Sequence, residues 1–221
     1  MKYFLDTNMP IGYTIIHDKH HENASRFIEK HSNSVFWSNF VEEEYLNTFN
    51  DISKSIRHFL DTIESILENN EKNFDYYLEF ENFIINKTKH VPLDEFKKLK
   101  ILENFWKDNE FAHANCENIY NNFVKFNRNF NRIYFKRDKN LNGIMKLHDC
   151  GRDNYLNYLN FALKLNSWGV HSPDYKIILD AHDCGIKHEE LIFVSADGKI
   201  FEALNGHELS FLKIMEFKSC N

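Results

Sequence analysis

Short apolar runs alternate with helical periodicity at both ends of the chain. Runs of aliphatic and aromatic residues predict three buried strands, at 2–7 (KYFLDT), 34–38 (SVFWS) and 191–195 (LIFVS), and an edge strand at 210–217. Apolar spacing of three and four predicts helices at 22–31 and 198–204, and another from Asp174 to about Gly185. Strand–helix alternation of this kind is typical of a parallel sheet covered by helices, so we expect an α/β fold.

Between about residues 39 and 166 the pattern is helical almost throughout, and only Pro92 and Gly143 interrupt it. Apolar residues recur there at three and four positions, as in Phe59, Leu60, Ile63, Ile66 and Leu67. We therefore expect one domain over 1–221, with its core drawn from about 1–50 and 167–221. An all-helical insertion would occupy 51–166.

Composition narrows the class of protein. The 221 residues are 43% hydrophobic and include 21 Phe and 10 Tyr, which argues against a disordered chain. We find no signal-peptide pattern and no apolar stretch of the roughly 18 residues that a membrane helix needs, so we expect a cytoplasmic protein without a membrane partner. The four cysteines form no C-x-x-C pair and are expected to be free thiols. The net charge of -6 allows only local patches for nucleic acid.

Acidic residues follow two of the predicted strands. Asp6 ends the first strand, and Asp197 comes two residues after LIFVS. Because parallel strands bring their carboxyl ends to one edge of a sheet, we expect these side chains to lie close together. Several carboxylates without a balancing cation suit a hard divalent metal ion.

Helical geometry selects a third acid. At 100° per residue, Asp174 shares the face of Ile177, Ile178 and Ala181, which should be buried. Asp180 and Asp183 fall away from that face and are expected to point to solvent.

A fourth acid should come from SNFVEEEYL, residues 38–46. Asn39 and Glu42 have the spacing of a capping box, which gives Glu42 a structural role. Glu43 points opposite the apolar face and is expected to be solvated. Glu44, at the border of that face, remains the candidate.

Four segments in this order resemble the PIN-domain ribonucleases, which include the toxins of many toxin–antitoxin pairs. They are FLDTN, SNFVEEEYL, SPDYKIILDAHDCG and LIFVSAD, and together they cover the two ends of the chain, about 90 residues. The chain departs from the family in the roughly 130 residues between Glu44 and Asp174, in the position of Ala181, and in the longer IKHEE turn before LIFVS.

The resemblance implies a three-layer α/β/α fold with a mainly parallel sheet, and Mg²⁺- or Mn²⁺-dependent hydrolysis of phosphodiester bonds. Asp6, Glu44, Asp174 and Asp197 would hold one or two metal ions, and Asn8 and Ser195 would orient the carboxylates or a water. The expected activity is that of an endoribonuclease acting on single-stranded or structured RNA, with single-stranded DNA as another substrate. An antitoxin protein and a second copy of the chain are candidate partners. The alternative is an inactive PIN-like module that binds RNA or a protein.

The tetrapeptide HDCG occurs twice, at 148–151 and 182–185, and His and Cys are zinc ligands. Residues two apart on a helix point roughly 200° from each other, so His182 and Cys184 are not expected to share a metal. We interpret the repeat as coincidental. The chain has no Gly-rich phosphate-binding motif, which disfavours the usual nucleotide-binding enzymes.

Substrate capture by an acidic protein requires a local basic surface. The segment 125–139 carries six Lys or Arg and one Asp. On a helix, Arg128, Arg132 and Lys136 share one face, while Phe126, Phe130 and Tyr134 line another. The basic stripe would track phosphates. The other interpretation is a solvated amphipathic helix whose aromatic residues belong to the core.

Overall fold

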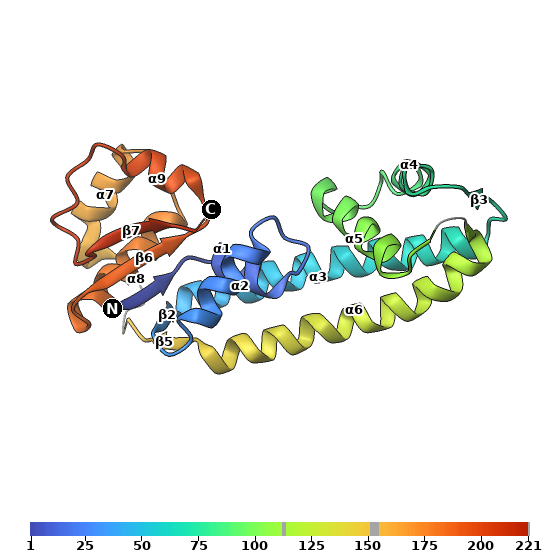
Figure 1. Ribbon diagram of the computed structural model, residues 1–221. Coiled ribbons are helices and arrows are strands. Elements are labelled where there is room, and N and C mark those ends of the chain that lie inside the picture. Colours follow the sequence, from blue (N-terminus) through green and yellow to red (C-terminus); the bar gives the residue numbers. More distant parts are fainter. Residues whose placement is uncertain (112–113, 151–154, 221) are drawn as a thin grey trace. The chain divides into compact units, whose positions relative to one another are not determined.

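The computed structural model describes residues 1–111, 114–150 and 155–220, and the chain divides into two compact units (Figure 1). The sheet unit comprises Met1–Thr14, His20–Asn47 and Lys139–Asn221, and the helical unit comprises Ile15–Lys19 and Thr48–Asp138. Residues 139–166, which we expected in the helical insertion, therefore belong with the sheet. No helix among the described residues combines the length and the apolar character needed to cross a membrane.

The sheet unit is built on five parallel strands, which confirms the expected α/β class and the mainly parallel sheet. In spatial order they are β5 (Lys146–His148), β2 (Val35–Ser38), β1 (Lys2–Leu5), β6 (Leu191–Ser195) and β7 (Glu216–Ser219). β5 lies in the region that we predicted to be wholly helical, and β7 begins six residues later than its predicted start. The strand order reverses beside β1, and ligands bind at the carboxyl ends of strands at such a point.

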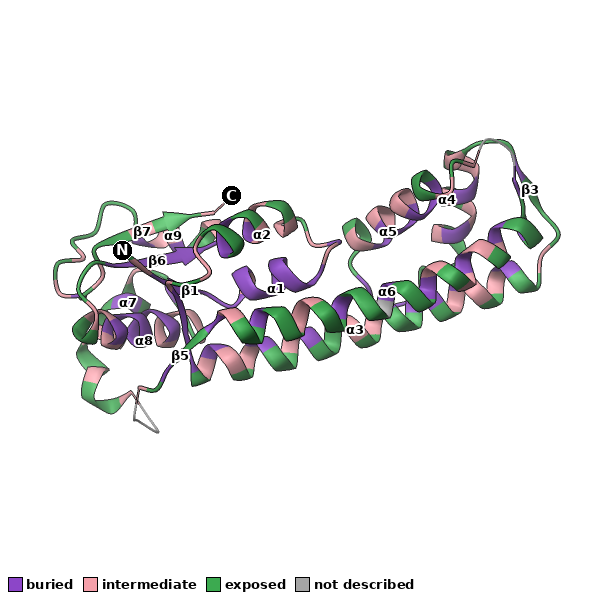
Figure 2. Cartoon of the chain, turned by 60° about the horizontal axis from the view of Figure 1, so that its bottom comes forward, coloured by how far each residue is buried: buried purple, intermediate pink, exposed green. Residues whose placement is uncertain are grey.

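Helices cover both faces of this sheet. On one face, the Tyr3 ring contacts Phe27 of α2 (His21–Lys30) edge-on at 5.2 Å, and α2 packs on α1 (Asn8–Thr14). The next residue toward the N-terminus, Lys2, contacts His188 directly after α8 (Asp174–Lys187). Because successive strand residues point to opposite faces, α2 and the end of α8 lie on opposite faces of the sheet. The result is an α/β/α layering, with buried residues along β1, β6 and α8 (Figure 2).

The outer side of α8 is also covered. A short 3-10 helix, η1 (Leu156–Tyr158), leads into α7 (Leu159–Ser167), which packs on α8. His182 contacts Tyr158 and Phe161 and accepts a hydrogen bond of 2.8 Å from the Lys213 backbone. A Cβ atom at Gly185 would lie 1.6 Å from the Lys213 carbonyl oxygen, so this close approach requires glycine. The remaining helix, α9 (Gly198–Leu204), packs beside β7.

The helical unit has an aromatic core. Its helices are α3 (Asn39–Glu68) from residue 48 onward, α4 (Tyr77–Lys87), α5 (Glu95–Asp108) and α6 (Cys116–Ile144) up to residue 138. Phe105 contacts the rings of Phe80, Phe123 and Phe126. An antiparallel pair that the sequence pattern did not predict, β3 (Asn73–Phe74) with β4 (Ala114–Asn115), joins the chain beside α4 and α6.

Residues 15–19 belong to the helical unit through a buried histidine. The His17 ring stacks on Phe130 and hydrogen-bonds Tyr134 through Nδ1 at 3.2 Å and Asn104 through Nε2 at 3.1 Å. Its neighbour Asp18 forms a 2.9 Å ion pair with Lys97. These polar contacts fix a loop that the hydrophobic pattern alone does not identify.

Candidate functional site

Asp6 lies at the carboxyl end of β1 and is 3% exposed. Its Oδ2 accepts a 2.5 Å hydrogen bond from the Ser195 hydroxyl at the end of β6, and its Oδ1 accepts one of 2.7 Å from the Thr7 backbone. Leu5 is in register with Val194, so Asp6 and Ser195 come to the same edge of the sheet. The structure therefore brings these two candidates into direct contact.

The ionisation of Asp6 reflects this environment. Burial raises its pKa to about 7, although the hydrogen bonds from Ser195 and Thr7 act in the opposite direction. The negative charges of Asp174 and Glu44 raise the pKa further. Without a cation, Asp6 is thus partly protonated near neutral pH.

Asp174 completes the group. Burial is the largest cause that raises the pKa of Asp174, and the negative charges of Asp197 and Glu44 raise it further. The opposing effects of His171 and Lys199 are smaller than either. All four acids expected from the sequence are thus electrostatic neighbours, although they come from separate segments of the chain.

Glu44 is held by a hydrogen bond of its own. The Thr7 hydroxyl donates to Glu44 Oε2 at 2.5 Å, which links α3 to the end of β1. Glu43 is exposed, as its position on the helix predicted. The expected cap was wrong: the Ser38 hydroxyl accepts the Val41 N–H at 3.2 Å, since the helix begins one residue after Ser38.

Asp197 has a structural role beside any metal-binding one. Its Oδ1 accepts the Lys199 N–H at 2.9 Å and caps α9, and its own N–H donates to Ser195 at 2.9 Å. The side-chain oxygen of Asn8 is buried and has no hydrogen-bond partner among the described residues. Of the six candidate side chains at this edge, Asn8 alone offers a buried oxygen without such a partner there.

The expected solvent exposure of Asp180 is wrong. Asp180 is 2% exposed and accepts a 3.2 Å hydrogen bond from the Tyr155 hydroxyl. Asp183 is half-buried and accepts one of 2.5 Å from Tyr158. The helical-wheel prediction assumed one buried face, whereas the segment from Tyr155 through α7 covers a second face of α8.

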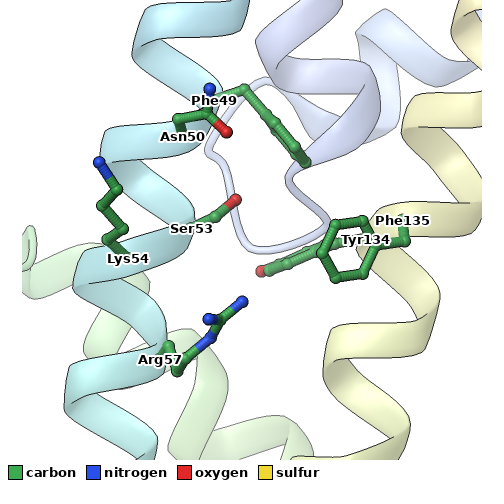
Figure 3. A pocket seen from close by; sticks show the side chains of 7 residues that line it. All are labelled: Phe49, Asn50, Ser53, Lys54, Arg57, Tyr134 and Phe135. Carbon is green, nitrogen blue, oxygen red and sulfur yellow. The ribbon is translucent and has the colours of Figure 1, made fainter.

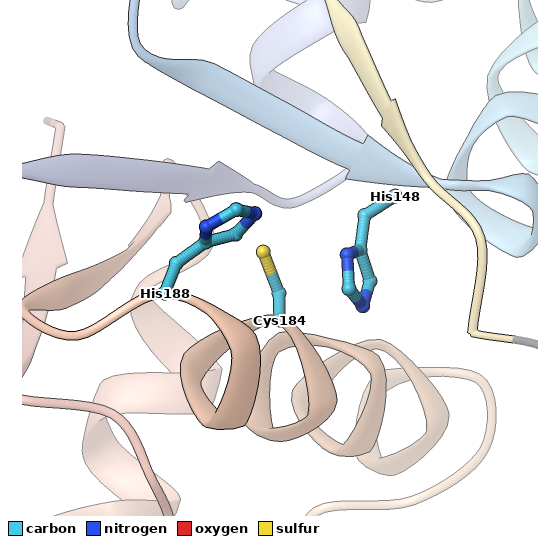
Figure 4. Close-up of side chains that lie close together, drawn as sticks. All are labelled: His148, Cys184 and His188. Carbon is cyan, nitrogen blue, oxygen red and sulfur yellow. The ribbon is translucent and has the colours of Figure 1, made fainter.

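A second cluster combines His148, Cys184 and His188, and their ligand atoms all lie within 4.8 Å of one another. Figure 4 shows the Cys184 sulfur between the two imidazole rings. Within the described ranges, it is the one group of three or more His, Cys, Asp or Glu residues that converges this closely. The four carboxylates are electrostatic neighbours but do not form such a group.

This cluster was not predicted from the sequence, although the repeated tetrapeptide HDCG pointed to it. Each HDCG contributes one residue, His148 and Cys184, while Gly151 lies outside the described residues. The geometric objection applied only to His182 with Cys184, and His182 indeed turns to the Lys213 backbone. His148 sits on β5, a strand that the pattern did not predict.

The basic stripe lies on the exposed side of α6. Arg128, Arg132 and Lys136 are exposed, and Phe130 and Tyr134 on the other side are buried. Phe130 and Tyr134 therefore belong to the core, whereas Phe126 is half-buried. Any nucleic acid held here would be bound through its phosphates.

The helical unit also contains a cavity of about 200 Å³ between α3 and α6 (Figure 3). Lys54 and Arg57 line it, together with the Ser53 hydroxyl, which is buried without a hydrogen-bond partner in the described structure. Tyr134 and Phe135 form the aromatic side. Figure 3 shows the Arg57 guanidinium and the Ser53 hydroxyl directed into the cavity, whereas the Lys54 ammonium points away from it, so one cation and one hydroxyl could contact an anionic group.

No family model matches this chain, and no significant match was found among curated proteins or among solved structures.

Proposed function

We propose that this protein is a metal-dependent nuclease with a PIN-like fold that hydrolyses phosphodiester bonds of RNA. One observation carries the proposal: four acids from distant parts of the chain gather at the carboxyl edge of a parallel sheet, where the charges of Glu44 and Asp174 act on Asp6 and those of Asp197 and Glu44 act on Asp174. Like charges gathered in this way are unfavourable without a cation. A hard divalent ion would relieve that repulsion.

The donor set fits Mg²⁺ or Mn²⁺. Asp6, Glu44, Asp174 and Asp197 supply carboxylate oxygens. The buried amide oxygen of Asn8, for which the described residues provide no hydrogen-bond partner, adds a neutral donor at the same edge. The Asp6 carboxyl would lose its proton when the metal binds, because a cation favours the ionised carboxylate. Ser195 would keep Asp6 in position, since its hydroxyl already donates to Oδ2.

When bound, the metal supplies an activated water and neutralises charge that develops on the scissile phosphate. The chain's own residues would orient the site. Thr7 holds Glu44, and Ser195 joins Asp6 to the Asp197 backbone. The proposed reaction requires no side-chain nucleophile.

RNA is the proposed substrate, with single-stranded DNA as another, in the cytoplasm. Arg128, Arg132 and Lys136 would bind phosphates through their exposed charges. An antitoxin protein that blocks the acidic edge, or a second copy of the chain, would be the proposed protein partner.

A matched pair of variants on α3 tests the activity. Purified protein is incubated with pooled cellular RNA and with single-stranded DNA in Mn²⁺, Mg²⁺ or EDTA. Cleavage should require a divalent ion and should be lost in Glu44→Gln. The control is Glu43→Gln, which changes the exposed neighbouring acid and should retain full cleavage. Equal cleavage by both variants would refute the carboxylate site.

The second candidate is a PIN-like module that binds RNA or a protein without cutting. It is favoured by the separate hydrogen bonds of Asp6, Glu44 and Asp197, which could serve structure alone. Metal-independent RNA binding without cleavage in the same assay would support it.

A further inference from the structure

We propose that His148, Cys184 and His188 form a binding site for Zn²⁺, separate from the carboxylate cluster. The three ligand atoms lie within 4.8 Å of one another (Figure 4). Two imidazoles and a thiolate are ligands typical of zinc and unlike those of Mg²⁺. The site shares no residue with the proposed catalytic cluster, and its test does not depend on nuclease activity.

The fold delivers these side chains from two elements. His148 ends β5 in register with Ser38 of β2, whereas Cys184 and His188 come from the last turns and the end of α8. His188 contacts the Phe36 ring at 4.9 Å, which fixes its imidazole against the sheet. A metal bound here would tie the edge strand β5 to α8 and to the sheet.

Burial and an unsatisfied atom point to a ligand. His148 is 4% exposed, and its Nε2 has no hydrogen-bond partner among the described residues. A buried ring nitrogen without a partner is unfavourable, and coordination to a metal would remove that cost. Cys184 is fully buried, so an oxidant or a large reagent has little access to its sulfur.

The ligand atoms of His148, Cys184 and His188 are slightly farther apart than zinc coordination requires. Zn–N bonds of about 2.0 Å and Zn–S bonds of about 2.3 Å place tetrahedral ligand atoms roughly 3.5 Å apart. The three ligand atoms now lie within 4.8 Å of one another, so zinc binding requires them to approach one another slightly. Three protein ligands leave a fourth position for water or for a carboxylate. Asp180 lies one turn before Cys184 on α8, and its charge acts on His148.

Lys2 is the competing cation. Its Nζ donates a 3.0 Å hydrogen bond to His188 Nδ1, and its charge acts on Cys184. If zinc binds Nδ1, Lys2 loses this acceptor. If zinc binds Nε2, Nδ1 carries the ring proton and again ceases to accept. Zinc binding therefore displaces Lys2 in either case, and Lys2→Met should bind zinc more tightly than the wild type.

Cobalt spectroscopy on the full chain tests the site. The protein is stripped of metal under reducing conditions and titrated with Co²⁺, then with Zn²⁺. We expect one tight equivalent, a thiolate-to-cobalt charge-transfer band and the intense visible bands of tetrahedral coordination. Zn²⁺ should abolish these signals by displacement. Octahedral cobalt bound by carboxylates alone gives no thiolate band.

Variants assign the ligands. Cys184→Ser and His148→Gln should lose the charge-transfer band and at least about a hundredfold in zinc affinity. Cys220→Ser, which changes another free cysteine, and Asp6→Asn, in the carboxylate cluster, should keep both. Absence of the band from the wild type, or its persistence in Cys184→Ser, would overturn the proposal. If Cys184→Ser does not fold, the wild-type spectrum and the tightening expected in Lys2→Met still decide it.

Discussion

The carboxylate cluster and the His148–Cys184–His188 cluster belong to the same sheet unit but differ in how their side chains are held. In the first, Asp6 accepts hydrogen bonds from the Ser195 hydroxyl and the Thr7 backbone, and Glu44 accepts one from the Thr7 hydroxyl. In the second, the three ligand atoms converge within 4.8 Å, and the Nε2 of His148 has no hydrogen-bond partner among the described residues.

This difference follows from charge. Four carboxylates repel one another when no cation is bound, which favours separation of their oxygen atoms. Neutral imidazoles and a thiol do not repel and can approach closely. We infer that close convergence in a metal-free structure identifies sites with neutral donors more readily than it identifies acidic ones.

The donors also predict different metals. Oxygen ligands favour Mg²⁺ and Mn²⁺, whereas nitrogen and sulfur favour Zn²⁺. If the two clusters act independently, a change in one should leave metal binding at the other unaltered.

The largest effect is expected from Asp6→Asn. Mn²⁺-dependent cleavage should fall by at least about a thousandfold, because the metal contributes several kcal/mol to the transition state. The cobalt–thiolate band should be unchanged in the same protein. Cleavage rates and cobalt spectra are measured on one preparation. Unchanged turnover would remove Asp6 from the proposed site, and loss of the cobalt band would show that the clusters are coupled.

The stability of the metal-free protein should depend on pH through Asp6. Burial raises the pKa of Asp6 to about 7, so between about pH 4 and 7 the folded protein keeps a proton that the unfolded chain has lost. The free energy of unfolding therefore falls as pH rises through this range. Asp6→Asn removes the cost of ionising this buried carboxyl, which reaches about 4 kcal/mol above pH 7.

The measurement is chemical denaturation in EDTA from pH 4 to pH 8. Asp6→Asn should exceed the wild type in stability at pH 8, and the difference should shrink toward zero at pH 4. Glu43→Gln, the exposed control, should follow the wild-type curve. A difference that grows toward low pH would mean that the carboxyl is stabilised in its ionised form.

Mn²⁺ should stabilise the wild type against heat, but not Asp174→Ala. A ligand at one hundred times its dissociation constant contributes about 2.7 kcal/mol to the folded state. Asp183→Ala is the matched change on α8: it loses the hydrogen bond from Tyr158 but should keep the Mn²⁺-induced increase in Tm. The reverse result would identify Asp183 as the third acid.

The smallest effect concerns substrate capture. Replacing Arg128, Arg132 and Lys136 together by Gln should weaken RNA binding and flatten its salt dependence by about two units of slope, since each phosphate contact to a single strand contributes about 0.7. The Mn²⁺-induced increase in Tm and the cobalt–thiolate band should both stay unchanged. Filter binding between low and moderate salt measures the slope, and an unchanged value would place the capture surface elsewhere.

The sequence by itself determined the fold class and predicted four acids that the structure places as electrostatic neighbours. Apolar runs ending at Asp6 and Ser195 are buried strands in a parallel sheet, because full burial on both faces requires such runs. The aromatic periodicity around Phe130 and Tyr134 indicated the buried side of α6, which the structure confirms. These features depend on local pattern, so they can be read without the fold.

Only the tertiary structure decided which side chains meet. Asp180 is buried because Tyr155 covers a face that a single-helix analysis treats as exposed. His148 reaches Cys184 because the three-residue strand β5 joins the sheet beside β2, and a strand this short has too little pattern to be predicted. Contacts between residues far apart in sequence depend on how the elements pack together, and local periodicity contains no information about that packing.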